Sequence, residues 1–154
     1  MRSHRMSRAV TLCAAASLVA GAGSASAAPA SPPATPTVKQ QTGSPVLVDC
    51  LWHPQVHPTD FMIACGDGNS RLTSLHWLSW NQNSAVGQGV NVVNDCKPYC
   101  AAGTFHSYPV VVRLDHSQPW KKHPQLRHYT QMSLVYTDAK PDGFAQAVTY
   151  PLWN

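Results

Sequence analysis

Two cysteines four residues apart, with a proline between them, mark the stretch that decides the fold: Cys96-Lys97-Pro98-Tyr99-Cys100-Ala101-Ala102-Gly103-Thr104-Phe105-His106. The three residues between the cysteines form a turn that contains Pro98, a residue that does not continue a helix. Alternating apolar runs flank this turn, through Val90 and Val92 before it and through Val110 and Val112 after it. Such alternation is typical of half-buried strands. We therefore predict a turn, closed by the two cysteines, that links two strands.

The first 27 residues are typical of a secretory signal peptide. Arg2, Arg5 and Arg8 precede an apolar segment over residues 9–22, and small residues at 25–27 form a cleavage site. The apolar segment is shorter than the roughly 20 residues that a membrane-spanning helix needs. We expect cleavage after Ala27, a secreted extracellular protein, and no membrane association once the signal is removed.

The next segment, residues 28–45, has the composition of a linker. It is rich in Pro, Ala and Thr and shows no periodic apolar pattern. Such a segment cannot bury enough apolar surface to fold, so we predict a disordered linker. The folded domain is then expected over residues 46–154.

Removal of the signal also changes the charge of the chain. Three of the eleven basic residues leave with it and all seven acidic residues stay, so the net charge falls from +4 to near +1. A near-neutral chain lacks the basic surface that nucleic acid requires, and we expect no nucleic-acid partner. Every acidic residue is Asp, which excludes any mechanism that needs Glu.

Four cysteines remain after the signal: Cys50, Cys65, Cys96 and Cys100. An even number in a short secreted chain indicates two disulfides, and four cysteines allow three connectivities. We favour Cys50–Cys65 with Cys96–Cys100, because close pairs meet at the lowest loop-closure cost. Structural zinc is the alternative, but the spacings contain no Cys-x2-Cys pair and fit it poorly.

Strand patterns dominate the rest of the domain. Seven short runs follow one another at intervals near a dozen residues, over 46–51, 61–65, 71–80, 86–92, 110–115, 131–136 and 144–153. In the third run Leu75 and Trp77 share one face while Leu78 and Trp80 share the other, which indicates a bulge or two covered faces. A polar excursion over 116–127 separates two of the runs. The predicted fold class is all-β, an antiparallel β-sandwich or small barrel with two disulfides.

Four motifs have linked Trp, Gly and Cys spacings: Ala64-Cys65-Gly66-Asp67-Gly68-Asn69, Leu75-x-Trp77-x-x-Trp80, Ala85-x-Gly87-x-Gly89, and Asn94-Asp95-Cys96-x-Pro98-x-Cys100-Ala101-x-Gly103-Thr104-Phe105-His106-x-Tyr108-Pro109. In these motifs the chain resembles a group of small secreted actinobacterial proteins of uncharacterised function. The resemblance runs from about residue 46 to the last strand. It implies secretion, two disulfides and a β-rich fold, and it carries over no catalytic residue.

Four residues are the candidate binding residues: Trp80, Trp120, Tyr99 and Lys97. A tryptophan face can stack on a sugar ring or anchor a protein partner. Trp77 and Trp80 cannot point the same way from a regular strand, so Trp80 is a candidate for the surface, and we expect Trp120 to be exposed in the polar excursion. Lys97 and Tyr99 lie in the cysteine turn.

No catalytic or metal-binding motif is found. Asp67, Asp95 and Asp115 offer carboxylates, and histidines at 76, 106 and 116 offer bases, but no spacing links them into a hydrolytic set. His53 and His57 stand four apart, yet the proline after each prevents a shared helical face. We predict no cofactor and no metal. Histidines 116, 123 and 128 are expected to be solvent-facing loop residues.

These observations predict a non-catalytic binding domain whose partner is an extracellular protein or a cell-wall glycan. The alternative is a protease inhibitor that presents the Cys96–Cys100 loop, with Lys97 as the anchor for a trypsin-like enzyme. Pro98 directly after Lys97 disfavours a substrate-like loop. A small extracellular hydrolase is the third hypothesis.

Overall fold

The structure, a computed structural model, describes residues 43–153. The predicted signal peptide over 1–27 and most of the predicted linker over 28–45 lie outside these residues. The described chain forms the following elements: β1 (Leu47–Val48), β2 (Pro54–Gln55), β3 (Phe61–Met62), β4 (Ser70–Trp80), β5 (Ala85–Asn94), the 3-10 turn η1 (Cys100–Ala102), β6 (Phe105–Trp120), β7 (His123–Tyr136) and β8 (Ala147–Pro151). The prediction of an all-β antiparallel fold is confirmed.

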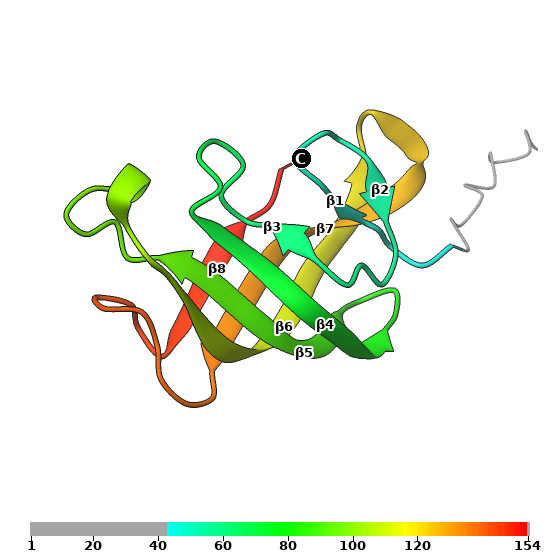
Figure 1. The fold of residues 1–154 in the computed structure, drawn as a ribbon. Helices are drawn as coiled ribbons and strands as arrows, with labels where there is room; N and C mark the ends of the chain where they lie inside the picture. Colours follow the sequence, from blue (N-terminus) through cyan, green and yellow to red (C-terminus); the bar gives the residue numbers. More distant parts are fainter. Residues whose placement is uncertain (1–42, 154) are drawn as a thin grey trace, which may run out of the picture. The chain divides into compact units, whose positions relative to one another are not determined.

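Six of the strands form one antiparallel sheet in chain order, β3-β4-β5-β6-β7-β8. Figure 1 shows β4 and β5 crossing in front of β6, β7 and β8, because the sheet curls over on itself. The short strands β1 and β2 pair separately, and Val46 joins them to the main sheet through an isolated parallel bridge to His128. The curl leaves one apolar inner face.

The inner face of the curl holds the main core. Its fully buried members come from β1, β4, β5, β6 and β7 and include Leu47, Leu72, Leu114, Met132 and Leu134. A polar pair is embedded among them, because the Tyr136 hydroxyl donates to Asn91 Oδ1 at 2.9 Å. Burial of this pair is tolerated because each polar group has a hydrogen-bond partner.

The predicted bulge in the third run is present in β4. The register against β5 shifts between Thr73 and His76 and again between Trp77 and Ser79. As a result Trp77 and Trp80 turn to the same side, where their rings meet edge to face at 4.6 Å and pack against the core. The expectation that the two tryptophans must point apart is therefore wrong, because it assumed a regular strand. Gly87 on β5 makes room, since a Cβ there would lie 2.9 Å from the Trp77 ring.

The predicted polar excursion over 116–127 is instead a β-hairpin. β6 continues to Trp120 and β7 begins at His123, so only Lys121 and Lys122 form the turn. Trp120 is fully buried against Val46 and Val48 in a second, smaller core. The prediction that Trp120 is exposed is wrong, because the segment around β1 covers this end of the hairpin.

The histidines of this hairpin differ from one another. His116 and His123 are exposed as predicted, whereas His128 is fully buried. The prediction for His128 is wrong for the same reason as that for Trp120, because Val46 bridges to it from outside the sheet.

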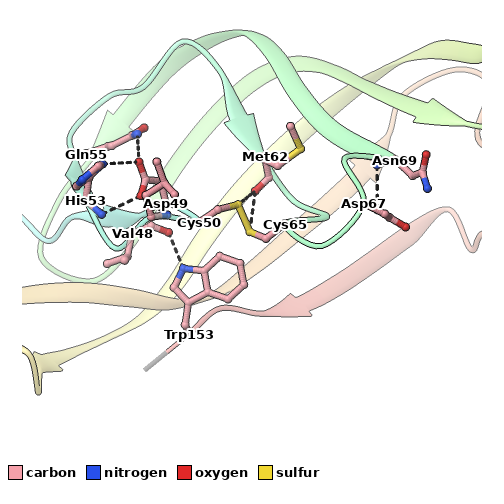
Figure 2. The surroundings of a disulfide bond; sticks show 11 residues. Val48, Asp49, Cys50, His53, Gln55, Met62, Cys65, Asp67, Asn69 and Trp153 are labelled. Atoms are coloured by element: carbon pink, nitrogen blue, oxygen red, sulfur yellow. Dashed lines mark hydrogen bonds and ion pairs between the residues drawn. A yellow bond between two sulfur atoms is a disulfide. The ribbon is translucent and has the colours of Figure 1, made fainter.

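Both favoured disulfides are present. Cys50–Cys65 joins the segment after β1 to the segment after β3, and Cys96–Cys100 closes the connection between β5 and β6. Figure 2 shows the Cys50–Cys65 disulfide and also the hydrogen bond that Trp153 Nε1 donates to Val48 O at 2.9 Å. Among residues 43–153 there is no helix of a length and apolarity that would cross a membrane.

Candidate functional site

Two connections at one end of the sheet enclose a pocket of about 450 Å³. The β5–β6 connection contributes Asp95 and Lys97, and the β7–β8 connection contributes Asp142 and Phe144. The first residues of β6 add His106 and Tyr108. Figure 1 shows both connections, with η1 in one of them, beyond the same end of the sheet. These six residues define what we call the cysteine-loop pocket.

Asn94, the last residue of β5, fixes the backbone of the cysteine loop. Its side chain is buried; Nδ2 donates to Asn69 Oδ1 at 2.9 Å and to Cys100 O at 2.8 Å, and Oδ1 accepts from Cys96 N at 3.0 Å. Gly103 lies directly against it, since a Cβ at this position would lie 2.0 Å from Asn94 Oδ1. The loop therefore depends on an amide at 94 and on the absence of a side chain at 103.

The Asp95 carboxylate is also fixed by hydrogen bonds to the backbone, and it orients the His106 ring. Its Oδ1 accepts from the backbone N–H groups of Lys97 at 3.1 Å and Thr104 at 2.9 Å, and its Oδ2 lies 3.0 Å from His106 Nε2. The Thr104 N–H, then the Lys97 N–H and the His106 ring, lower the pKa of Asp95 to about 2, because each stabilises the charged carboxylate. Asp95 is thus an ionised, oriented group in the pocket wall.

A second charged pair joins the two connections. Lys97 Nζ donates to Asp142 Oδ2 at 2.8 Å across 45 residues of sequence. The hydrogen bond and charge of Asp142 raise the pKa of Lys97, and Lys97 lowers the pKa of Asp142. Both groups stay charged at neutral pH and compensate each other. An ammonium has three donors and a carboxylate two acceptor oxygens, so the pair can bind further polar groups.

The apolar part of the pocket comes from two half-buried rings. Tyr108 and Phe144 each pack edge to face against the buried Tyr136, at 6.2 and 6.3 Å between centroids. Because Tyr136 is anchored in the core through Asn91, both rings have a fixed support. The pocket can therefore offer hydrogen bonds on one side and ring surface on the other.

The four predicted binding residues do not come together. Lys97 lines the pocket, and Tyr99, with 63% of its surface exposed, is on the same loop. Trp80 is half-buried at a distance in sequence from this loop; its Nε1 donates to Pro45 O at 2.7 Å and its ring packs against Tyr129. Trp120 is part of the second core. Only the two residues of the cysteine turn are placed to bind a ligand at this end.

Of the carboxylates and histidines considered from the sequence, the structure joins Asp95 with His106. Asp67 accepts from the Asn69 N–H within its turn, and Asp115 pairs with Arg113. Among the described residues no three His, Cys or Asp side chains gather as a metal site.

Sequence reasoning missed three residues of the pocket: Tyr108, Asp142 and Phe144. Asp142 stands in a Pro-Asp-Gly turn, a pattern that indicates only a turn. Its partner Lys97 is 45 residues away, and no local pattern reports a contact over that separation. In the sequence Phe144 begins a predicted strand and Tyr108 stands just before one, and neither position indicates a site.

Comparisons with protein-family models, with curated proteins and with solved structures find no match for this chain.

Proposed function

We propose that the protein is an extracellular, non-catalytic binding domain and that its cysteine-loop pocket binds a neutral saccharide unit of a cell-wall glycan. One observation carries the proposal: the pocket combines compensated charged groups with two supported aromatic rings. A sugar presents hydroxyls that donate and accept around an apolar ring face, and these two kinds of surface complement it.

The charge balance favours a neutral ligand over an ionic one. Lys97 already compensates Asp142, and Asp95 already accepts two backbone N–H groups and faces His106. A charged ligand would have to displace one of these partners. The hydroxyls of a neutral ligand can instead form additional hydrogen bonds with these charged side chains without displacing their partners. Hydrogen bonds to a charged group are stronger than those between neutral groups.

Export to the cell exterior is part of the proposal, as is membership of the actinobacterial group that the motifs resemble. The signal-like first 27 residues support export. The two disulfides are consistent with an oxidising extracellular compartment.

Sedimentation with insoluble peptidoglycan tests the proposal, with chitotetraose as a soluble neutral competitor. Three proteins are compared: wild type, the pocket variant Lys97→Met/Asp142→Asn, and the matched control Arg113→Met/Asp115→Asn, which removes an exposed ion pair of 2.7 Å away from the pocket. We expect wild type and control to bind alike and the pocket variant to bind about tenfold more weakly, the effect of losing a charge-assisted hydrogen bond. Equal binding by all three proteins, or no binding by wild type, would overturn the proposal.

A protease inhibitor is the second candidate, and the exposure of the Cys96–Cys100 loop supports it. Residues 97–100 are all exposed within the disulfide-closed turn. Against it, the Lys97 ammonium that would enter a trypsin-like pocket is bonded to Asp142. An inhibition assay with trypsin at equimolar protein tests this function, and Asp142→Ala should improve inhibition by releasing Lys97. Full trypsin activity with both proteins removes this candidate.

A hydrolase is the third candidate, and the Asp95–His106 pair inside a pocket supports it. A carboxylate that orients an imidazole is the arrangement of a general base. In the part of the chain that the structure describes, no Ser, Thr or Cys side chain is hydrogen-bonded to His106, so the base would have to act on water. Release of reducing ends from peptidoglycan, compared between wild type and His106→Gln, tests this; no release by wild type excludes it for this glycan.

A further inference from the structure

The last strand, β8, lies at one edge of the six-stranded sheet. It pairs with β7 on one side, from Gln131↔Pro151 to Val135↔Ala147, and no other strand of residues 43–153 pairs with its second side. An edge strand presents a row of backbone donors and acceptors that can pair with another chain.

The register shows which backbone groups of β8 point outward. Tyr136 N donates to Gln146 O at 2.9 Å, and Leu152 N donates to Thr130 O at 2.8 Å. The backbone groups of the even-numbered residues of β8, Val148 and Tyr150, therefore face β7. In an antiparallel pair the alternate positions point away from the neighbouring strand. The N–H and C=O groups of Ala147 and Thr149, and the C=O of Pro151, therefore point outward. Among residues 43–153 no hydrogen bond occupies these outward groups.

This edge lacks the usual protection against pairing. Natural edge strands carry charged side chains, prolines or bulges, yet residues 144–153 contain no charged residue and the β7–β8 register has no shift. Pro151 is the single blocking residue of the strand and stands at its end. The residues whose backbone points outward, Ala147, Thr149 and Pro151, are all exposed.

The opposite edge of the sheet is different, because the chain covers it. β3 pairs with only two residues of β4. The segment that precedes β3 covers the next part of β4. Leu75 N donates to Thr59 O at 2.8 Å, and Trp77 Nε1 donates to Pro58 O at 2.9 Å. Of the two edges, β8 is the one left open to another strand.

We propose that two copies of this chain associate through antiparallel pairing of their β8 strands about a two-fold axis, so that one sheet continues across the dimer. The strand is self-complementary in this arrangement. With the axis at Thr149, each Thr149 N–H meets the Thr149 carbonyl of the other copy, and each Ala147 N–H meets the other copy's Pro151 carbonyl. The position without a donor, Pro151, thus supplies only an acceptor, and every outward N–H of the strand is satisfied.

A second copy fits this edge for an electrostatic reason as well. Like charges directly opposite each other destabilise a strand pair, and a two-fold axis always places a residue near its own copy. Because β8 is uncharged, self-pairing brings no such repulsion. The strand has five residues and its contact area is small beside a standard protein interface of roughly 1,600 Å². The dimer is therefore expected to be weak and dependent on concentration.

The proposal does not depend on the ligand of the cysteine-loop pocket. If the pocket binds a polymer, two pockets in one dimer would bind it with avidity. The dimer itself is tested without any ligand.

Sedimentation-velocity ultracentrifugation of wild type, Thr149→Pro and Thr149→Val tests the dimer from about 10 µM to about 1 mM, the range of weak affinities. Both substitutions remove the hydroxyl contact to Ser133 at 3.0 Å, but only proline removes the outward N–H. Proline is tolerated on an edge strand where its N–H would face solvent. Wild type and Thr149→Val should dimerise alike, and Thr149→Pro should dimerise at least about tenfold more weakly.

A wild type that stays monomeric over the whole range overturns the proposal, as does a Thr149→Pro variant that dimerises like wild type. Amide hydrogen exchange of wild type gives a test that needs no variant. The Ala147 and Thr149 amides should exchange more slowly as protein concentration rises, while the Val148 and Tyr150 amides, which already face β7, should not change. Exchange at 147 and 149 that is independent of concentration contradicts the dimer.

Discussion

The two ends of the curled sheet use their side chains in opposite ways. At the hairpin turn of β6 and β7, Trp120 is fully buried with Val46 and Val48, and Lys122 Nζ lies 3.5 Å over the ring of Trp52. At the cysteine loop, charged pairs and half-buried rings surround an open pocket. Buried tryptophan thus belongs to the packed end of the fold, whereas the other end carries the charged pairs and smaller rings on which the proposed binding depends.

The difference arises from what covers each end. The segment around β1 crosses the hairpin, with Val46 N donating to Arg127 O at 2.9 Å and Tyr129 N donating to Val46 O at 3.1 Å. At the cysteine loop no strand crosses the pocket among the described residues, and the two connections meet through the Lys97–Asp142 bond. The hairpin end is therefore closed by backbone pairing, whereas at the open end a side-chain ion pair joins the two connections.

The largest effect is expected at the closed end. Trp120→Ala should lower the free energy of unfolding by about 3–5 kcal/mol, because it removes a fully buried ring and leaves a cavity. Urea denaturation measures the loss, and binding by the folded fraction should not change. Trp52→Ala is the control, since Trp52 is exposed and should cost far less. A similar loss for both variants would contradict the assignment of Trp120 to the core.

The two disulfides should differ in what their removal does. Cys50→Ser/Cys65→Ser should cost about 3 kcal/mol and Cys96→Ser/Cys100→Ser about 2 kcal/mol, because the second loop is shorter. Only the second pair braces the pocket, so only its removal should abolish glycan binding by the folded protein. Denaturation curves and the peptidoglycan assay measure the two effects separately. Loss of binding in the first variant alone would reverse the comparison.

Acid should weaken the hydrogen bonds that Asp95 accepts in the cysteine loop. The folded-state pKa of Asp95, about 2, lies below the ordinary value of 3.8. The carboxylate therefore stabilises the loop above about pH 4, and this contribution is lost as pH falls towards 2. NMR of the Lys97 and Thr104 amides, which donate to Asp95, should report the change. In Asp95→Asn these amide shifts should lose their titration, and a titration that persists would contradict the assignment to Asp95.

The smallest effect on stability is expected at the Lys97–Asp142 pair. Both side chains are exposed, and exposed ion pairs contribute little to folding because water screens them. Lys97→Met/Asp142→Asn should therefore leave the denaturation midpoint unchanged while weakening glycan binding. A shift of the midpoint as large as that of Trp120→Ala would show that the pair belongs to the fold and not to the site.

Much of the fold could be predicted from local patterns. Alternation of apolar residues, as in Val110 and Val112, marks strands because one face of the sheet is buried. The cysteine pairing followed from loop-closure cost. Trp120 shows where this reasoning fails: its neighbours in sequence are polar, and its burial depends on Val46 and Val48, more than 70 residues earlier. No local pattern contains that contact.

The site was predictable only in part, for a similar physical reason. Lys97 and Tyr99 could be selected because a closed turn exposes its side chains, and both are exposed. Asp142 and Phe144 enter the pocket through the β7–β8 connection, whose position depends on the order of strands in the sheet. Sequence patterns indicated strands but not that order.

The contact between Gly103 and Asn94 has a consequence for how this protein can evolve. A Cβ at 103 would overlap Asn94 Oδ1, and Asn94 in turn holds the backbone at Cys96 and Cys100. A mutation at either position alone would break the loop, so the two codons should change together or not at all. In any set of homologous sequences, glycine at 103 should therefore accompany asparagine at 94, and this covariation would identify the chains that keep the pocket.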